Sequence, residues 1–282
     1  MQKRAIAVHD ISCVGRCSLT VALPILSAAG VNTAVVPTAL LSTHTGEFSG
    51  YTHLDLSGQL SPIARHLSTL GLHFDAFYSG YLASGAQVDD ILAMMDALCD
   101  EQTHIFVDPA FADRGRLYSL LDEAMPRQMR RLCARAHTIV PNLTEAAFLL
   151  GEPFPDQNAD EALIGAFLRE LCKLGPQNAV ITDVSYEPGS TGVAVYSRGM
   201  ASPRFFKRKR YEGVFHGTGD VFASFLLGGL LNDQKLETAA GLALDLTHES
   251  IRLALKDGEP LRYGVPFEKA LPLYWRRLRR DA

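Results

Sequence analysis

The segment His216-Gly217-Thr218-Gly219-Asp220 places two glycines and a carboxylate directly before an apolar stretch, VFASFLLGGLL. Glycines let backbone N–H groups approach a ligand closely, and the start of a helix adds the positive end of its dipole. Asp220 could accept a proton from an attacking hydroxyl while these N–H groups hold a phosphoryl group. The segment therefore indicates phosphoryl transfer to an alcohol. Alternatively, Thr218 only caps the helix and Asp220 only complements its dipole.

A second polar pair occurs in Pro141-Asn142-Leu143-Thr144-Glu145, after a short apolar run. Asn142 and Glu145 stand three positions apart on a predicted helix, so both side chains could reach one metal ion or its waters. Magnesium bound to a triphosphate is a candidate. The competing interpretation is a capping box, in which Asn142 caps the helix and Glu145 bonds back to the cap.

The segment VDPAFAD places Asp108 at the end of a strand-like run and Asp113 five residues later. Ligands of doubly wound sheets bind beyond the carboxyl ends of the strands, where two carboxylates could position a cation. Alternatively, Asp113 and Gly115 belong to a polar turn.

Elements that could position these residues alternate through the first half of the chain. Short apolar runs at 5–8, 33–36, 75–80 and 104–108 are typical of buried strands. Helical patterns at 17–30 and 87–100 separate them, and the second puts Ile91, Met94, Met95 and Leu98 on one face. This rhythm predicts a doubly wound α/β fold with a mostly parallel central sheet flanked by helices.

The pattern changes in the second half. An apolar run at 137–140 precedes a helix at 143–151 that Gly151 stops, and a longer helix is predicted over 159–174. Three strand-like runs at 178–184, 191–197 and 203–211 then follow without a helix between them, which predicts an antiparallel extension of the sheet. Two final helices are predicted to begin near Thr218 and Lys235.

Composition narrows the possible partners. The net charge of −4 provides no overall positive field for nucleic acid or anionic lipid, so small molecules are the expected partners. No apolar stretch reaches the roughly 18 residues of a membrane span. Five scattered cysteines fit neither a zinc site nor a disulfide framework. We expect a cytoplasmic protein that binds no nucleic acid and no membrane.

Other catalytic classes lack their motifs. The chain contains no Gly-Lys pair for a P-loop, no HRD or DFG of a protein kinase, and neither HExxH nor GxSxG. The basic run at 207–210 is predicted to be a solvated strand or flap rather than a nucleic-acid patch, because the overall charge is negative. Alternatively, the run lies near the phosphates of a bound nucleotide.

In their joint order, these segments resemble the pyridoxal/pyridoxamine kinases of the ribokinase superfamily, which neighbour the hydroxymethylpyrimidine kinases. The resemblance covers nearly the whole chain and includes HDISCVGRCS, LSTHTGEFSGY, YSGYLAS, VDPAFADRGRLY, VPNLTEA and FHGTGDVFAS. It implies one ribokinase-like domain over residues 1–282. This domain would transfer phosphate from ATP to the 5′-hydroxymethyl group of a B6 vitamer, in the salvage of pyridoxal 5′-phosphate. It also implies Mg²⁺ with the ATP, K⁺ as a further candidate cation, and a homodimer.

The resemblance also implies roles for single residues. Asp220 would be the catalytic base, and Gly217, Thr218 and Gly219 would form the anion hole. The nucleotide and its cation would be held by Asp108, Asp113, Tyr118, Asn142, Glu145 and Thr182, with Asp108 and Glu145 as the metal ligands. The acceptor pocket would be drawn from Asp10, His44, Thr45 and Tyr81. For His44, the alternative is a hydrogen-bonded structural histidine.

Asp10 departs from the family pattern, because pyridoxal kinases usually carry a serine where this chain aligns Asp10. An ionised carboxylate in the pocket would favour a cationic acceptor. Pyridoxamine would then be preferred over pyridoxal.

Three alternatives remain open. A hydroxymethylpyrimidine or hydroxymethylpyrimidine-phosphate kinase would use the same fold and base on a similar ring. A catalytically silent vitamer-binding protein would keep only the pocket. A sugar kinase of the same superfamily fits less well, because LSTHTGEFSGY and YSGYLAS are typical of a pocket for a flat ring.

Overall fold

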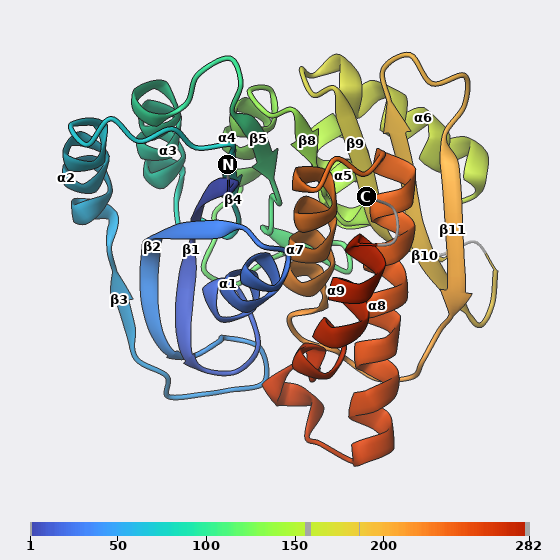
Figure 1. Cartoon of the computed structure of the whole chain (residues 1–282). Helices are drawn as coiled ribbons and strands as arrows, with labels where there is room; N and C mark the ends of the chain where they lie inside the picture. Colours follow the sequence, from blue (N-terminus) through green and yellow to red (C-terminus); the bar gives the residue numbers. More distant parts are fainter. Residues whose placement is uncertain (1, 156–158, 186, 280–282) are drawn as a thin grey trace.

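The computed structural model describes residues 2–155, 159–185 and 187–279, and this part of the chain is built around one nine-stranded sheet (Figure 1). Its strand order is β11-β10-β9-β8-β5-β4-β1-β2-β3. The neighbours from β9 to β2 pair in parallel, whereas β10 and β11 are antiparallel. The mostly parallel sheet and its antiparallel C-terminal extension are thus confirmed. A further antiparallel strand, β3, closes the other edge and had not been expected.

The strands of this sheet are β1 (Arg4–Val14), β2 (Asn32–Thr43), β3 (His53–Asp55), β4 (Ala76–Ser79), β5 (His104–Val107), β8 (Thr138–Ile139), β9 (Asn178–Val184), β10 (Ser190–Ser197) and β11 (Arg204–Lys209). A separate small hairpin pairs β6 (Ala112–Asp113) with β7 (Arg116–Leu117). The apolar run of β4 is buried at every position, because helices cover the sheet on both faces.

Two layers of helices enclose the sheet (Figure 1). On one face lie α2 (Ser57–Ser68), α3 (Gly85–Leu98), α4 (Met125–Cys133), α5 (Leu143–Leu150) and α6 (Glu161–Lys173). On the other lie α1 (Leu19–Ala28), α7 (Thr218–Leu231), α8 (Leu236–Asp257) and α9 (Leu271–Leu278), with the short 3-10 helices η2 (Leu261–Tyr263) and η3 (Phe267–Lys269). Alternate residues of β1 serve the two cores, since Ile6 and Val8 pack on the first and Ala5 on the second.

Local sequence signals explain where the predicted helices begin and end. Ser84 caps α3 by accepting a hydrogen bond from the Gln87 N–H, and the predicted face of this helix is buried or partly buried. Gly151 ends α5 in the left-handed conformation, with φ 75°. All five cysteines are free thiols, as their scattered positions predicted.

The strands β1 and β2 continue beyond their neighbours. β1 pairs with β4 only from Ala5 to Val8, whereas its pairing with β2 runs on to Val14. Figure 1 shows the two strands curving away from the rest of the sheet, with β3 beside them. The register between β1 and β2 shifts between His9 and Ile11, so Asp10 lies at a bulge, a device that often re-aims a side chain beside a binding site.

Candidate active site

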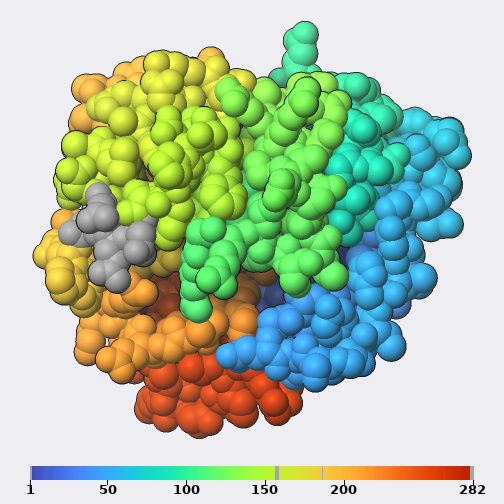
Figure 2. Space-filling model, turned by 180° about the vertical axis from the view of Figure 1, so that it is seen from behind, coloured from blue at the N-terminus to red at the C-terminus, as the bar shows by residue number. Residues whose placement is uncertain are grey.

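Three of the predicted nucleotide residues meet where neighbouring parallel strands end. Asp108 directly follows β5, Asn142 follows β8, and Thr182 lies near the end of β9. Asn142 and Thr182 form an isolated parallel bridge, and the Thr182 N–H donates to the Pro141 carbonyl at 3.0 Å. Figure 2 shows the surface hollowed where blue N-terminal, green middle and orange C-terminal segments meet. The predicted site residues come from these same parts of the chain.

The Gly-Thr-Gly-Asp turn opens α7 as predicted, although Thr218 does not cap it. The N-cap is Gly217, with φ 72°, and a Cβ on this residue would lie 1.9 Å from the Arg16 carbonyl oxygen. Only glycine fits such a left-handed, tightly packed position. The Thr218 hydroxyl instead donates to the Phe215 carbonyl at 2.9 Å. The capping alternative is therefore wrong for Thr218.

Asp220 lies in the first turn of α7 and is partly buried. Burial raises the pKa of its carboxyl from 3.8 to about 7; the negative charge of Asp10 also raises it, while the Ser18 backbone N–H donates to the carboxylate and opposes the rise. A general base is most effective when its pKa lies near the working pH. The environment of Asp220 therefore suits it to accept a proton at neutral pH.

Asp10 lies close to this base and is only 6% exposed. Its Oδ1 accepts a hydrogen bond from the Ser18 hydroxyl. Burial raises the pKa of Asp10, although the Ser18 hydrogen bond and the charge of His53 favour the ionised form. The assumption that Asp10 is ionised therefore depends on what pairs with it.

Asp108 and Glu145 form a buried pair of carboxyl groups, 8% and 2% exposed. Burial raises the pKa of both; the charge of Glu145 further raises that of Asp108, and Asp113 further raises that of Glu145. A cation beside two such carboxyl groups would relieve their mutual repulsion. The pair therefore fits a metal ion. No larger cluster is present, because the described residues contain no group of three or more His, Cys, Asp or Glu side chains that could hold a metal ion.

The side chains of Asn142 and Glu145 are already engaged within the fold. Asn142 Oδ1 accepts from the Glu145 N–H, and Glu145 Oε2 accepts from the Asn142 N–H, both at 2.9 Å. This is the capping box of the alternative interpretation, which is confirmed. Glu145 Oε1 also accepts from the Phe111 N–H at 2.9 Å, and Asn142 Nδ2 donates to the Ala112 carbonyl at 2.7 Å. Asn142 and Glu145 therefore also hold the loop after Asp108 against the start of α5 by hydrogen bonds.

The turn predicted around Asp113 and Gly115 is the tip of the β6–β7 hairpin. Arg114 and Gly115 both have positive φ, 49° and 74°, as a tight two-residue hairpin turn requires. The Asp113 side chain is 47% exposed and lies 3.7 Å from the Arg114 guanidinium. The polar-turn alternative is confirmed. The hairpin still brings Asp113 near Glu145, because its charge acts on the pKa of that residue.

Two neighbouring tyrosines lie between the candidate acceptor residue Asp10 and the buried carboxyl group of Glu145. The rings of Tyr81 and Tyr118 lie 6.4 Å apart between centroids. Burial, followed by the charge of Asp10, raises the pKa of Tyr81 to about 12. Tyr118 is 38% exposed, and desolvation of its phenol and then the charge of Glu145 raise its pKa. Both phenols are therefore neutral hydrogen-bonding groups at pH 7.

His44 is held as a structural histidine, in line with the alternative interpretation. Its Nδ1 accepts from the Gly46 N–H at 3.1 Å, so the other nitrogen, Nε2, donates to the Arg262 carbonyl at 2.6 Å. Burial lowers the pKa of His44. Thr45 is exposed on the same loop. This loop also reaches the Gly-Thr-Gly-Asp turn, because a Cβ on Gly46 would lie 2.6 Å from the His216 ring.

Two residues of the site were missed by the sequence-based predictions. Ser18 contacts both Asp10 and Asp220. In the sequence, however, a serine at the start of a helix predicts only an ordinary N-cap. Asp183, beside Thr182 near the end of β9, is exposed and has φ 54°, a conformation that residues with a side chain rarely adopt. Ser18 ends the segment HDISCVGRCS that carries part of the resemblance, but the sequence assigned a role to neither residue.

Basic residues away from this edge behave as solvated surface. Lys207 pairs with Glu187 at 2.9 Å and Arg208 with Asp245, which confirms the basic run as a solvated strand.

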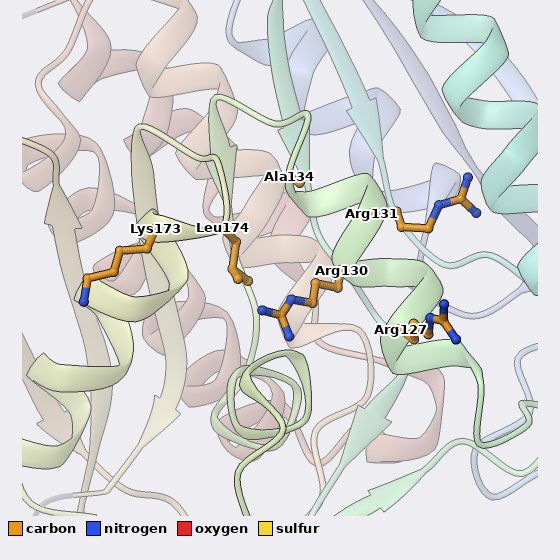
Figure 3. Close-up of a pocket in the computed structure, with 6 residues that line it drawn as sticks. All are labelled: Arg127, Arg130, Arg131, Ala134, Lys173 and Leu174. Atoms are coloured by element: carbon orange, nitrogen blue, oxygen red, sulfur yellow. The ribbon is translucent and has the colours of Figure 1, made fainter.

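A shallow groove of about 630 Å³ is lined by Arg127, Arg130, Arg131, Ala134, Lys173 and Leu174. It lies where β8 and β9 begin, opposite the candidate active site. In Figure 3, Arg130 extends toward Leu174, whereas Arg131 turns to the other side of α4, where it pairs with Asp89 at 2.7 Å. None of the described helices is long and apolar enough to cross a bilayer.

The ribokinase-like sheet, with an aspartate in the first turn after a Gly-Thr-Gly segment, defines a small-molecule kinase. The chain belongs to the phosphomethylpyrimidine kinase family, whose model matches residues 23–263. A Bacteroides thetaiotaomicron protein assigned as a phosphomethylpyrimidine kinase and solved with pyridoxal is 35% identical, with a TM-score of 0.93 over 97% of this chain and 96% of that one.

Two further relatives show the breadth of the family. The pyridoxal kinase of Lactobacillus plantarum is 29% identical, with a TM-score of 0.88 and 98% of each chain covered. The hydroxymethylpyrimidine/phosphomethylpyrimidine kinase of Mycobacterium leprae is 26% identical over 250 residues, which span 85% of this chain and 83% of that protein.

Proposed function

We propose that this protein is a pyridoxal/pyridoxamine kinase, which transfers the γ-phosphoryl group of ATP to the 5′-hydroxymethyl group of a B6 vitamer. The observation that carries the proposal is the partly buried Asp220 in the first turn of α7, with a pKa near neutrality, beside a glycine turn that exposes backbone N–H groups. Pyridoxal in the related Bacteroides structure supports the choice of acceptor.

In this proposal Asp220 orients and deprotonates the hydroxymethyl group. The N–H groups of Gly217, Thr218 and Gly219 form an anion hole for the transferring phosphoryl group. Because the transition state of phosphoryl transfer is loose and its charge is spread over oxygens, positioning and electrostatic stabilisation contribute most of the rate. The left-handed Gly217, fixed against Arg16, pre-orients the N–H groups before substrate binds.

The nucleotide would lie along the ends of β8 and β9. Asn142 and Thr182 are bridged there, and the hairpin carrying Asp113 and Tyr118 flanks them. When bound, Mg²⁺ would neutralise charge on the triphosphate, with K⁺ as a further candidate cation. Asp108 and Glu145 would hold the divalent ion. Mg²⁺ commonly takes one or two carboxylates from a protein and its other ligands from phosphate and water.

The acceptor pocket would use Asp10 and Tyr81 as its polar contacts. His44 would shape the wall rather than bond the acceptor, because both of its ring nitrogens are already engaged. Thr45, exposed on the same loop, stays a predicted contact. A cationic amine would pair with Asp10 and favour its ionised form, so we keep the preference for pyridoxamine as part of the proposal.

A hydroxymethylpyrimidine or its phosphate is the second candidate acceptor, because the family model and the Mycobacterium leprae relative carry that activity in their names. The test is ADP release with purified protein, Mg²⁺-ATP and a panel of pyridoxamine, pyridoxal, pyridoxine, hydroxymethylpyrimidine and ribose. Turnover on B6 vitamers with little on the pyrimidine supports the proposal. Turnover on the pyrimidine alone would replace it with the second candidate.

We also propose a homodimer. Its support is the family resemblance and a small exposed apolar patch on the curved strands, formed by Leu40 and Leu54, which are 39% and 57% exposed. Leu40 and Leu54 are direct cross-strand partners. Light scattering should give twice the 30.8 kDa chain mass, and Leu54→Asp should lower the measured mass if this patch is the interface. A wild-type mass of one chain would reject the dimer.

A further inference from the structure

Ser18 adopts a backbone conformation that residues with a side chain rarely adopt. It lies between β1 and α1 with φ 50° and ψ −129°. Positive φ of this kind crowds a Cβ against the backbone, so glycine is the usual occupant. A residue held in such a conformation commonly marks a functional site.

The Ser18 side chain does not cap its own helix. Ser18 is the N-cap residue of α1, yet its hydroxyl makes no cap hydrogen bond, in contrast to Ser84 at the start of α3. The hydroxyl donates instead to Asp10 Oδ1, while the Ser18 backbone N–H donates to Asp220. One residue therefore contacts both a predicted acceptor contact and the predicted base.

The loop that carries Ser18 is fixed from the opposite side. Arg16 donates through its backbone N–H to the Tyr263 carbonyl at 2.9 Å and pairs with Glu268 at 2.9 Å. Its own carbonyl packs against Gly217, at the start of α7. The position of Ser18 relative to Asp10 and Asp220 is thus set by contacts to β1, α7 and the C-terminal segment at once.

We propose that Ser18 is a positioning residue for the acceptor, which holds the Asp10 carboxylate in a fixed orientation and at a fixed place relative to Asp220. This inference rests on the proposed function. A fixed, ionised Asp10 would bind the amine of pyridoxamine in register with the base, so Ser18 contributes to acceptor specificity without touching the transferring phosphoryl group. Loss of the hydroxyl would leave a buried carboxyl group without its donor.

Two substitutions separate this role from a contribution to folding alone. Ser18→Ala removes the hydroxyl and keeps the strained backbone, whereas Ser18→Gly removes the hydroxyl and relieves the strain, so the glycine variant should have the higher Tm of the two. Thr103→Ala is the matched control. It removes another buried hydroxyl, which donates to the Phe74 carbonyl at 2.9 Å at the opposite edge of the sheet.

Steady-state kinetics on pyridoxamine and pyridoxal, with Tm in parallel, give the test. We expect both Ser18 variants to raise KM for pyridoxamine and to lower its kcat/KM relative to pyridoxal by roughly tenfold, the usual effect of losing a hydrogen bond to a charged group. KM for ATP should stay unchanged. In an Asp10→Asn background, Ser18→Ala should have no further effect on this ratio. Thr103→Ala should lower Tm and leave the ratio as in the wild type.

Two results would overturn the inference. Wild-type kinetics in both Ser18 variants, or kinetic losses that follow Tm and are therefore smaller in Ser18→Gly, would reduce Ser18 to a structural residue while vitamer phosphorylation stands. A wild-type protein that phosphorylates neither vitamer would instead remove the proposed function, and this inference with it.

Discussion

At the scale of single residues, the proposed chemistry depends on how burial shifts the pKa of Asp220. A carboxylate at its ordinary pKa of 3.8 would be fully ionised at pH 7 but a weak base. Burial raises this pKa to about 7, so the group remains substantially ionised at neutral pH and binds a proton more readily. The Ser18 N–H limits the rise by favouring the charged form.

The pH dependence of kcat/KM for the vitamer should report this shift. Only ionised Asp220 can accept the proton, so kcat/KM for the vitamer should fall about tenfold for each pH unit below about 7 and level off above it. The measurement is kcat/KM from pH 5 to 8.5 at saturating Mg²⁺-ATP. A flat profile down to pH 5 would contradict the assigned base.

Asp220→Asn should stabilise the protein while it abolishes the proposed role of the base. The folded state raises the pKa of Asp220 above its unfolded value, so ionisation opposes folding; this penalty is complete above about pH 7 and fades as pH falls toward 4. The amide does not ionise. We expect Tm at pH 8 to rise by about 2–4 °C, the shift that roughly 1 kcal/mol gives in a domain of this size, and the gain to vanish at pH 4. Equal gains at both pH values would point to another cause.

Sequence reasoning placed the candidate site residues in the fold better than it predicted their contacts. The positions of Asp220 at a helix start and of Asp108 at a strand end were predictable, because glycines and apolar strand runs mark them locally. The engagement of His44 was not, since its partner Arg262 lies 218 positions along the chain. Ser18 was missed for a different reason, because residue type does not reveal that φ is positive and that the hydroxyl turns away from its helix.

At the scale of elements, the ends of β5 and the start of α5 place two carboxyl groups together. Asp108→Asn removes one charge and should relieve the repulsion between Asp108 and Glu145. We therefore expect an unchanged or higher Tm, together with at least a tenfold rise, roughly, in the Mg²⁺ concentration for half-maximal activity. Asp96→Asn, which breaks an exposed pair with Arg135, is the control and should change neither. Unchanged Mg²⁺ dependence in Asp108→Asn would remove Asp108 from the metal site.

The two glycines of the turn before α7 should respond differently to alanine. At Gly217 a Cβ would lie 1.9 Å from the Arg16 carbonyl at positive φ, so Gly217→Ala should lower Tm by several degrees and reduce kcat about a hundredfold or more. At Gly219 nothing lies within 4 Å of the added Cβ. Gly219→Ala should therefore keep or raise Tm, and any fall in kcat would come from a methyl group placed in the anion hole. Equal Tm values for the two variants would contradict this packing.

The elements that sequence reasoning found are those with plain apolar patterns. The strands of the parallel sheet are short apolar runs, and α5 has both a capping box and a terminal glycine. In contrast, β3 is exposed at all three positions, and α4 carries three arginines among nine residues. β3 forms by pairing with β2, and α4 forms by burying Met125, Met129, Leu132 and Cys133 against the core, so no continuous apolar run marks either element in the sequence.

At the scale of the whole molecule, the candidate site draws its residues from both halves of the chain. β1, with Asp10, lies beside β4 in the middle of the sheet, while Asp220 comes from α7 on the face that α1 also covers. The loop at Arg16 joins these parts by packing against Gly217 and by pairing with Glu259 and Glu268. That residues 1–282 form a single domain stays a prediction, which one cooperative unfolding transition would support.

The direct test of the whole account is whether purified protein with Mg²⁺-ATP converts a B6 vitamer to its 5′-phosphate, identified by chromatography, and whether Asp220→Ala loses this conversion. We predict formation of the 5′-phosphate by the wild type and a kcat lower by roughly 10²–10⁴-fold in the variant, the usual contribution of a general base. No 5′-phosphate from any vitamer, or equal turnover by Asp220→Ala, would contradict the account.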